Sequence, residues 1–338
     1  MTSHKGTDLM TRIGYIFPPF LFVLSLLLAA CQPEAEEPFA KAVPNGVVDV
    51  RDAPSQAELE APTQIVLLGT GTPVPDARRA GPSIAVIHKG EAYLFDLGAG
   101  AVRNATIARY KYDIPALYPS LICCVFFTHL HSDHTADYVE LAYTLWWRRD
   151  RSLRAWGPEG LKAFTDGMYA MMEPDRLLRT AGTQPIPVPQ TYAVDVAEIS
   201  DGIVLEKDGM TIEAFSVNHG EMKPAFGYRI VTGDKTVVIS GDTAYSDTIV
   251  EMSRGADLLF HEVISDEALE RTRPDYQPYM RKAHTTATDL ARLASIARPG
   301  LLVLTHVLFY GVADEVVIGE VKKGYDGEVV LANDLDIY

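Results

Sequence analysis

The amino-acid sequence predicts a layered α/β domain that follows an N-terminal targeting segment. Short apolar runs of strand-like composition come first in pairs, and later runs alternate with stretches of helical periodicity. Polar residues that can carry chemistry directly follow several of these runs. The chain has 338 residues, of which 47% are hydrophobic, so it can bury a substantial core.

The first thirty residues have the pattern of a targeting signal. Lys5 and Arg12 precede an apolar run at 16–30, which is the length of a signal-peptide core and short for a bilayer span. The run ends in Leu28-Ala29-Ala30-Cys31, which resembles the lipobox of bacterial lipoproteins. We therefore expect a lipoprotein signal peptide at 1–30 and export to the periplasmic side of a bacterial membrane, anchored through lipidated Cys31. A secretory signal with a chance cysteine and an uncleaved anchor are the alternatives.

The chain after Cys31 divides into two parts. Residues 31–62 are rich in Glu, Pro and Ala without a clear apolar period, which indicates a flexible tether. Residues 63–338 form the expected globular domain. Apolar runs predict its strands at 64–68, 84–88, 92–95, 121–127, 211–217, 227–231, 236–239, 257–260, 301–304 and 328–331. Helical periodicity predicts helices ending near 110 and at 136–147, 158–172, 247–254 and 286–297, with an irregular stretch at 178–202.

Overall charge and cysteine content limit the function classes. Thirty Lys and Arg against 45 Asp and Glu give a formal charge of −15, which argues against a nucleic-acid partner and favours a small-molecule substrate. Three cysteines are too few for a disulfide framework. Cys123 and Cys124 lie in the apolar run 121–127, where we expect them to act as two small buried hydrophobic residues, because adjacent cysteines rarely pair without strain.

The segment Thr128-His129-Leu130-His131-Ser132-Asp133-His134 is the most informative part of the sequence. It follows the apolar run 121–127 and opens a helix. Side chains two apart on an extended segment point the same way, so His129 and His131 can share one ligand position, whereas Asp133 and His134 turn toward a second. The motif predicts that one loop contributes ligands to two metal ions.

Three more candidate ligands follow apolar strands further along the chain. They are His219 in Val217-Asn218-His219-Gly220, Asp242 in Ser240-Gly241-Asp242-Thr243, and His306 in Leu304-Thr305-His306. A histidine after a strand is usually a packed or surface residue, so each would be weak support alone. The four segments together, in this order, make the prediction of a metal site strong.

The complete pattern resembles the metallo-β-lactamase superfamily, whose signature is T-H-x-H-x-D-H. The resemblance covers about 64–338 and implies an αββα sandwich of two mixed β-sheets flanked by helices. It implies that His129, His131 and His219 bind one metal ion, that Asp133, His134 and His306 bind a second, and that Asp242 bridges them. The expected cofactor is two divalent ions, with Zn²⁺ first and Mn²⁺ or Fe²⁺ as alternatives. Asp96, in a D-x-G-x-G turn, resembles the aspartate that supports a ligand histidine in this family.

Further segments resemble one branch of this superfamily. Gly69-Thr70-Gly71-Thr72-Pro73 and His284-Thr285-Thr286 resemble ribonuclease Z-like members, and the terminal Asp334-Leu335-Asp336-Ile337-Tyr338 resembles arylsulfatase-type members. The resemblance implies that His284 donates a hydrogen bond or proton at the site, and that Asp133 also accepts a proton from the attacking water. His261-Glu262 either orients His284 or forms a buried structural pair. A homodimer is suggested, although the sequence leaves the oligomeric state open.

The expected function is dinuclear metal-dependent hydrolysis of an ester-type bond, with a sulfate ester or phosphodiester ranked first. A lactonase of the same fold, and a non-hydrolytic metal-binding or redox member, are the alternatives. Only 23 positions separate His219 from Asp242, which leaves no room for the long basic arm of transfer-RNA-processing members. Residues 145–154 form either an anion-binding or dimer surface or an ordinary helix end. Phe309 and Tyr310 either line the mouth of the site or pack in the core.

Overall fold

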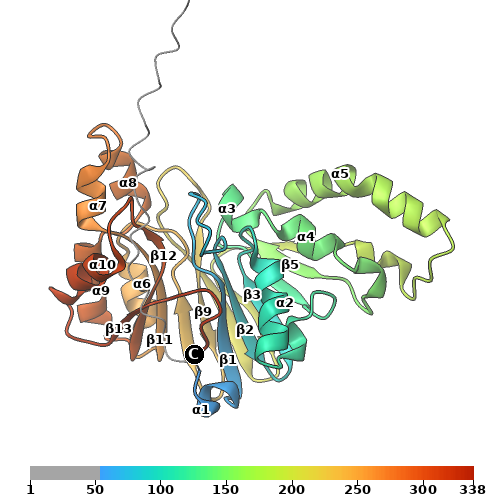
Figure 1. Cartoon of the computed structure of the whole chain (residues 1–338), viewed down its shortest axis with the longest axis horizontal. Helices are drawn as coiled ribbons and strands as arrows, with labels where there is room; N and C mark the ends of the chain where they lie inside the picture. Colours follow the sequence, from blue (N-terminus) through green and yellow to red (C-terminus); the bar gives the residue numbers. More distant parts are fainter. Residues whose placement is uncertain (1–53) are drawn as a thin grey trace, which may run out of the picture. The chain divides into compact units, whose positions relative to one another are not determined.

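Two β-sheets lie face to face in the computed structural model, which describes residues 54–338 (Figure 1). The first sheet has six strands, in the order β1 (Thr63–Gly69), β2 (Ser83–His88), β3 (Glu91–Phe95), β4 (Cys124–Phe126), β5 (Arg154–Gly157) and β6 (Asp195–Glu198). The second has seven, in the order β13 (Val329–Leu331), β12 (Leu301–Leu308), β11 (Leu258–Ile264), β10 (Thr236–Ile239), β9 (Phe226–Val231), β8 (Met210–Ser216) and β7 (Gly202–Lys207).

Both sheets are mixed. In the first, β1, β2 and β3 pair antiparallel and β3 to β6 run parallel. In the second, β7 to β10 pair antiparallel and β10 to β13 run parallel. The carboxyl ends of parallel strands meet at one edge of a sheet, so the loops that follow them come together there.

Helices cover the outer face of each sheet, as Figure 1 shows. The helices are α1 (Gln56–Leu59), α2 (Ala101–Lys111), α3 (Ser132–Thr135), α4 (Tyr138–Tyr143), α5 (Leu161–Ala181), α6 (Asp247–Ser253), α7 (Asp266–Arg271), α8 (Gln277–Ala283), α9 (Ala287–Ala297) and α10 (Asp314–Lys322). Apolar side chains of α2, α4 and α5 pack on the first sheet, and those of α6, α9 and α10 pack on the second. The predicted αββα sandwich is confirmed.

The inner faces of the two sheets enclose an aromatic cluster. Phe126 stacks on Trp156 with ring centroids 4.6 Å apart and on Phe95 at 5.1 Å, and Tyr228 of the opposite sheet meets Phe126 edge-on at 5.8 Å. Such offset and edge-to-face pairs add roughly 0.5–1.5 kcal/mol each to the burial term. The cluster holds β3 and β4 firmly just before the loops that carry the motif residues.

The C-terminal segment closes the outer edge of the first sheet. Its backbone pairs with β1 through hydrogen bonds between Ile65 and Tyr338 in both directions, at 3.0 and 2.9 Å. The carboxylate of Asp334 accepts hydrogen bonds from the backbone N–H of Thr70 and of Ala80, at 3.0 and 2.7 Å. The terminal pattern noted in the sequence therefore protects a sheet edge and holds the loop that follows β1.

Several elements differ from the sequence-based prediction. Within the run 121–127, residues 122–127 are buried and Leu121 is exposed, and only Cys124–Phe126 forms a strand. The two cysteine sulfurs are joined in a disulfide instead of remaining free thiols. Periodicity missed β5, β6 and β7, which are short strands, and no residue of the last two is fully buried. It also missed α7, α8 and α10, because helices of six to nine residues present too few turns for a periodic signal.

The targeting segment 1–30, Cys31 and most of the expected tether lie outside the described residues. The last part of the expected tether is not wholly irregular, because α1 forms there with a capping box between Ser55 and Glu58. Among residues 54–338, no helix has the length and apolar character needed to cross a membrane.

Candidate metal centre

The seven predicted ligands come together at the carboxyl edge of the two sheets. His129 and His131 lie in the loop between β4 and α3, and Asp133 and His134 lie in α3 itself. The others lie after β8 and β10 and in the bulge of β12. They are His129, His131, Asp133, His134, His219, Asp242 and His306. Five of them are almost fully buried, and His131 and Asp133 are partly exposed.

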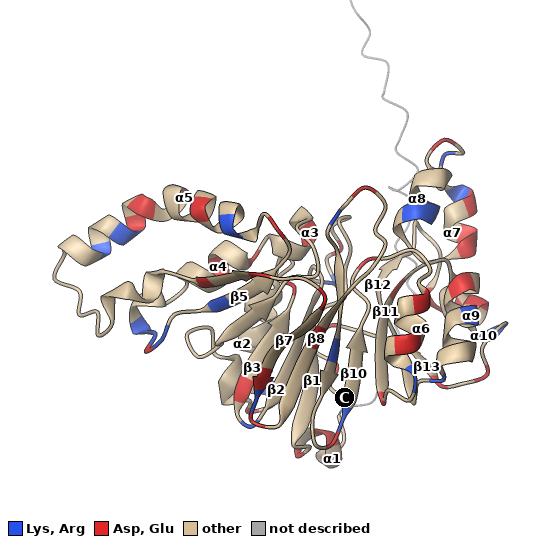
Figure 2. Ribbon diagram, turned by 180° about the vertical axis from the view of Figure 1, so that it is seen from behind, with Lys and Arg blue, Asp and Glu red and all other residues tan. Residues whose placement is uncertain are grey.

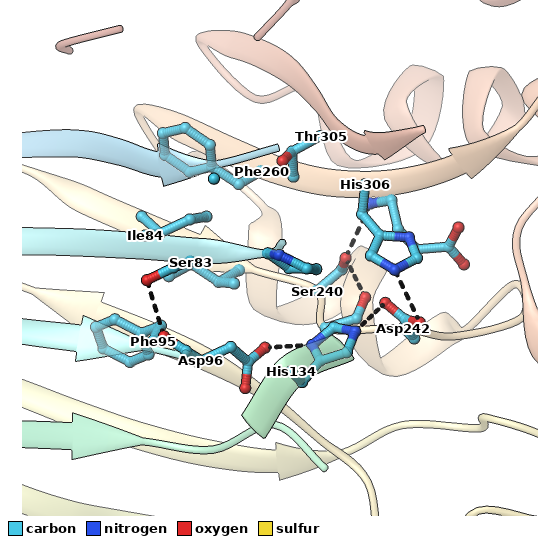
Figure 3. A pocket seen from close by; sticks show the side chains of 15 residues that line it. Ser83, Ile84, Phe95, Asp96, His134, Ser240, Asp242, Phe260, Thr305 and His306 are labelled. Atoms are coloured by element: carbon cyan, nitrogen blue, oxygen red, sulfur yellow. Dashed lines mark hydrogen bonds and ion pairs between the residues drawn. The ribbon is translucent and has the colours of Figure 1, made fainter. Parts of the chain in front are cut away.

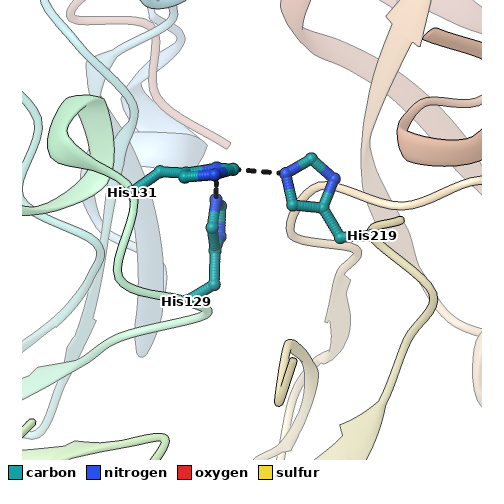
Figure 4. Close-up of side chains that lie close together, drawn as sticks. All are labelled: His129, His131 and His219. Atoms are coloured by element: carbon teal, nitrogen blue, oxygen red, sulfur yellow. Dashed lines mark hydrogen bonds between the residues drawn. The ribbon is translucent and has the colours of Figure 1, made fainter. Parts of the chain in front are cut away.

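Three imidazoles form the first group. Nδ1 of His131 lies 2.9 Å from Nε2 of His129 and 3.1 Å from Nε2 of His219 (Figure 4). Nδ1 of His129 faces the Thr128 hydroxyl at 2.9 Å, and Nδ1 of His219 donates to the Ala283 carbonyl at 2.7 Å. Because the Nδ1 protons are used there, the Nε2 lone pairs of His129 and His219 converge on the same space.

Asp133, His134 and His306 form the second group. Oδ2 of Asp133 lies 3.4 Å from Nε2 of His134 and 3.3 Å from Nε2 of His306. Nδ1 of His134 faces Asp96 Oδ2 at 2.8 Å, which leaves the Nε2 lone pair pointing at the carboxylates. That buried Nε2 has no hydrogen-bond partner among the described residues.

Asp242 lies between the two groups. Its Oδ1 is 3.5 Å from Nε2 of His134, and its Oδ2 is 3.4 Å from Nε2 of His306 and 3.9 Å from Nε2 of His219. Figure 3 shows this carboxylate facing the His134 and His306 rings beside a small cavity of about 30 Å³. One carboxylate therefore reaches members of both groups, which is the position a bridging ligand needs.

A β-bulge directs His306 into the cluster. Along the β11–β12 pair, Glu262 alone faces both Thr305 and His306, so β12 contains one extra residue there. His306 has φ 46°, a left-handed conformation that is uncommon for a residue with a side chain. Backbone strain of this kind is found where the surroundings hold a functional side chain in place.

The Asp96 carboxylate holds the motif segment in place by hydrogen bonds. Its Oδ1 accepts a hydrogen bond from the Thr128 N–H, and its Oδ2 accepts from the Thr128 hydroxyl and from His134 Nδ1, all at 2.8 Å. The loop passes so close to Gly98 that a Cβ there would lie 2.5 Å from the Asp133 carbonyl oxygen. The D-x-G-x-G turn therefore supplies both a supporting carboxylate and room for the motif backbone.

Burial and mutual charge shift the ionisation of the cluster. Burial lowers the pKa of His129 well below its ordinary value and also lowers the pKa values of His131 and His219. Burial alone would raise the pKa of Asp242, but the neighbouring His306 and His134 hold it well below its usual range. Neutral His129, His131 and His219 beside ionised Asp242 are protonation states that bind a divalent cation. Burial alone would lower the pKa of His134, but the Asp242 and Asp96 carboxylates raise it well above its ordinary value.

His284 lies beside the cluster but outside its two main groups. Its Nδ1 is 3.4 Å from Oε1 of Glu262, and its ring centroid is 5.2 Å from that of His219. The same Glu262 oxygen accepts from the Thr285 N–H at 2.9 Å. Glu262 thus faces His284, whereas Nδ1 of His261 contacts the Glu262 carbonyl. His261 and Glu262 are both buried and joined by this contact, and the Glu262 carboxylate also faces His284, so both roles considered for the two neighbours are present.

In the arginine-rich segment 145–154, two central side chains are buried and stabilise the fold. The Arg149 side chain is buried and donates to the carbonyls of Ile122, Pro119 and Leu141 at 2.8–2.9 Å. Trp146 is fully buried. These two side chains are unavailable to a substrate, so they form no anion-binding wall.

The donor set fits divalent metal ions. Around a tetrahedral ion with bonds of about 2.1 Å, neighbouring ligand atoms are about 3.4 Å apart. The separations within the second group, 3.3–3.5 Å, have this size and are too long for strong hydrogen bonds. A cation between these groups would satisfy the Nε2 atom of His134, which otherwise lies buried without a partner.

Comparison with known proteins gives one family and a group of similar enzymes. Residues 93–307 match the beta-lactamase superfamily domain. The ribonuclease Z of Mycobacterium sp. (strain KMS) is 33% identical over 248 residues, which cover 72% of this chain and 84% of that protein. Among solved structures, the metallo-beta-lactamase fold protein YhfI from Bacillus subtilis superimposes with a TM-score of 0.60 at 20% identity, over 82% of this chain and 99% of its own. The short form of human tRNase Z gives 0.59 at 23% identity, over 81% and 98%.

These relatives correct one prediction. The expectation of no nucleic-acid partner is contradicted, because the similar curated proteins are named ribonucleases. The error came from treating the formal charge of −15 as evenly spread, whereas nucleic-acid binding depends on local surface charge.

Contacts that connect distant segments were not predicted. The Ala283 carbonyl that orients His219 lies in an element that the sequence did not connect to that histidine. The Glu262 carboxylate faces His284, which is one of the two roles that the sequence analysis considered for His261-Glu262. Thr128 carried a usable signal, since it opens the motif and its hydroxyl links Asp96 to His129.

Proposed function

We propose that this chain, which belongs to the beta-lactamase superfamily, is a dinuclear phosphodiesterase with RNA among its substrates. The proposal proceeds from its activity as a metal-dependent hydrolase of ester bonds. The observation that carries the proposal is the position of Asp242 between two sets of convergent donor atoms. The 33% identity to a ribonuclease Z supports a phosphodiester over other ester bonds. Zinc is the expected metal, because imidazole and carboxylate donors in a site with an open position suit catalytic zinc.

Each group has a role that its surroundings support. When bound, the two ions would supply Lewis acidity that polarises the ester and lowers the pKa of the attacking water. His129, His131 and His219 would hold one ion, and Asp133, His134 and His306 would hold the other, with Asp242 shared. Burial alone would raise the pKa of Asp133, but His306 and His134 lower it, so this partly exposed carboxylate stays ionised and can accept a proton from water.

His284 is suited to proton donation. Burial alone would lower the pKa of His284, but the Glu262 carboxylate raises it, which favours the imidazolium form. An imidazolium beside the cluster can donate a proton or hydrogen bond to the leaving oxygen. Glu262 acts as a positioning residue, because it faces His284 and is itself held by backbone N–H groups of Thr243 and Thr285.

Turnover measured together with metal content tests this function. The purified chain, loaded with Zn²⁺ or Mn²⁺, is assayed with an RNA oligonucleotide, bis(4-nitrophenyl) phosphate, 4-nitrophenyl sulfate and a lactone. We expect hydrolysis of the phosphodiesters that EDTA abolishes. Two bound ions with no phosphodiester turnover would refute the proposal, and preferential cleavage of the sulfate or the lactone would replace it with those activities.

We also propose that the chain is anchored to the periplasmic side of a bacterial membrane through a lipid on Cys31. The support is the order of Lys5, Arg12, an apolar run and small residues before that cysteine. Mass spectrometry of the mature N-terminal peptide tests it. We expect an acylated Cys31 and, in Cys31→Ala, loss of the modification. An unmodified N-terminus in the parent chain would refute the anchor.

A further inference from the structure

Two tyrosines expose their rings on the helix next to the metal centre. Tyr276 and Tyr279 are 42% and 43% exposed, and their ring centroids lie 5.2 Å apart with an interplanar angle of 33°. Two neighbouring aromatic rings that each keep more than two fifths of their surface in solvent offer an apolar contact surface. Nothing in the αββα core requires these rings, since no apolar cluster of the described residues includes them.

Helix α8 is attached directly to the metal cluster. The Ala283 carbonyl, at the end of α8, accepts the Nδ1 proton of His219 at 2.7 Å, and Lys282 forms a 2.9 Å ion pair with Glu221. Positions 276, 279 and 283 have the i, i+3, i+7 spacing of one helix face. Tyr276 directly precedes α8 and Tyr279 lies in its first turn, so both belong to the segment whose other end holds His219.

Electrostatic coupling agrees with this placement. Burial is the largest cause that raises the pKa of Tyr279, and the carboxylates of Asp242 and Asp133 raise it further. Both are predicted metal ligands, so the phenol lies close enough to the cluster to experience its charge.

Tyr310 supports the pair from the other side of the site. It follows His306 by four residues, and its hydroxyl contacts Met280 Sδ of α8 at 3.9 Å. Burial, with a smaller contribution from a hydrogen bond to Tyr276, raises the pKa of Tyr310 to about 12. The segment after β12 and helix α8 are thus joined beside the metal centre. Of the two roles considered for Tyr310, core packing is the one that the structure shows, because its partly buried ring packs against two apolar clusters of the core.

We propose that Tyr276 and Tyr279 form a stacking platform that binds a planar aromatic group of the ester substrate beside the metal centre. The proposal rests on the proposed function and adds a substrate class: esters whose group next to the scissile bond is a nucleobase or an aryl ring. Stacking on an aromatic side chain tolerates many planar groups, because every such ring has a π-face. Figure 2 shows basic residues in blue on α8. Of these, Arg281 is exposed in the last turn, and a cation there suits an anionic ester.

Equilibrium binding tests the platform without relying on turnover. The zinc-loaded chain is titrated by calorimetry with adenosine monophosphate, phenyl phosphate and methyl phosphate, which share a phosphate and differ in the attached group. We expect the two aromatic ligands to bind about tenfold more tightly than methyl phosphate. Tyr279→Ala should remove most of that preference, Tyr276→Ala should reduce it, and Tyr279→Phe should retain it because the ring remains. If only adenosine monophosphate shows the preference, the ligand is a nucleobase; if phenyl phosphate shows it equally, any aryl ester qualifies.

Matched controls separate the platform from a structural role. Tyr110→Ala removes a 70% exposed tyrosine far from α8 in sequence and should leave the preference unchanged. All variants should keep the parent metal content and melting temperature. An unchanged preference of Tyr279→Ala for the aromatic ligands would overturn the platform, whatever the oligomeric state of the variant. Absence of phosphodiester turnover with intact aromatic preference would refute only the proposed function.

Discussion

Nδ1 of His134 lies 2.8 Å from Oδ2 of Asp96, and the same oxygen also accepts the hydroxyl proton of Thr128. Through this carboxylate the end of β3 sets the tautomer of one predicted ligand and, by way of Thr128, of His129. Such outer contacts fix the orientation of metal-binding imidazoles. They also identify the side chain whose removal should weaken the centre without deleting a ligand.

Asp96→Asn should weaken metal binding about 10- to 100-fold, because asparagine cannot accept all the hydrogen bonds that Asp96 accepts. Asparagine tolerates the left-handed backbone at this position, where φ is 60°, so the fold should persist. Competition with a fluorescent zinc chelator measures the change. Asp113→Asn, at a side chain that is 92% exposed, is the control and should bind as the parent does. Parent-like affinity in Asp96→Asn would contradict the supporting role.

The two donor groups predict selective loss of ions. His219→Ala should retain about one zinc per chain, His306→Ala should also retain about one, and Asp242→Ala should weaken both sites, because its carboxylate faces both groups. Inductively coupled plasma mass spectrometry after gel filtration gives the stoichiometry. His88→Ala removes a buried histidine that contacts Thr63 and should keep both ions. Loss of every ion from His219→Ala alone would favour a single site.

Substitutions of the two proposed proton-transfer residues, Asp133 and His284, should differ in their effect on metal content. Asp133→Ala should abolish turnover and lower metal content, since the carboxylate belongs to the second group. His284→Ala should reduce kcat about 10²- to 10⁴-fold while metal content stays close to that of the parent. Steady-state kinetics and metal analysis on the same preparations distinguish the two. Loss of an ion from His284→Ala would make that residue a ligand, as its proximity to His219 and Asp242 allows.

Buried Arg149 should be important for stability. Burial lowers its pKa to about 10, so it remains charged at pH 7 while donating to three backbone carbonyls. Arg149→Met would leave those carbonyls unpaired and should lower the free energy of unfolding by about 3–5 kcal/mol. Urea denaturation measures this loss. The adjacent Arg148→Met changes an exposed side chain and should cost under about 0.5 kcal/mol. If both substitutions lowered the free energy of unfolding equally, the hydrogen bonds of Arg149 to the three carbonyls would not be the source of the loss.

Glu91 should make stability depend on acid pH. Burial alone would raise the pKa of Glu91, but its bonds to Lys207, Tyr93 and Arg151 lower it from 4.5 to about 2. The ionised form is thus favoured by folding, so its contribution is complete above pH 4.5 and is lost as pH falls toward 2. Because the group is partly exposed, we expect about 1 kcal/mol.

Unfolding of the parent and Glu91→Gln at pH 7 and pH 3 tests this contribution. The parent should be more stable by about 1 kcal/mol at pH 7, and the difference should shrink at pH 3. Glu159→Gln, at an exposed position, serves as the control and should show little difference at either pH. A difference of equal size at both pH values would contradict the depressed pKa of Glu91.

Local patterns were sufficient where the chemistry lies in one segment. The motif from Thr128 to His134 placed four candidate ligands where one strand passes into a helix, two before α3 and two inside it. A buried strand followed so closely by a helix leaves little freedom for these residues. Strand ends likewise located His219, Asp242 and His306, since parallel strands present their carboxyl ends together. Overall charge failed as a guide to partners, because a sum over the chain says nothing of its surface distribution.

The sequence by itself therefore determined the αββα architecture, the seven candidate ligands and their order along the chain. Only the tertiary structure decided which atoms face one another: the bulge that turns His306 inward, the Ala283 carbonyl that orients His219, and the neighbouring rings of Tyr276 and Tyr279. The physical reason is that periodicity and spacing report the environment of a residue within its own element. Contacts between elements far apart in sequence depend instead on how the sheets and helices pack.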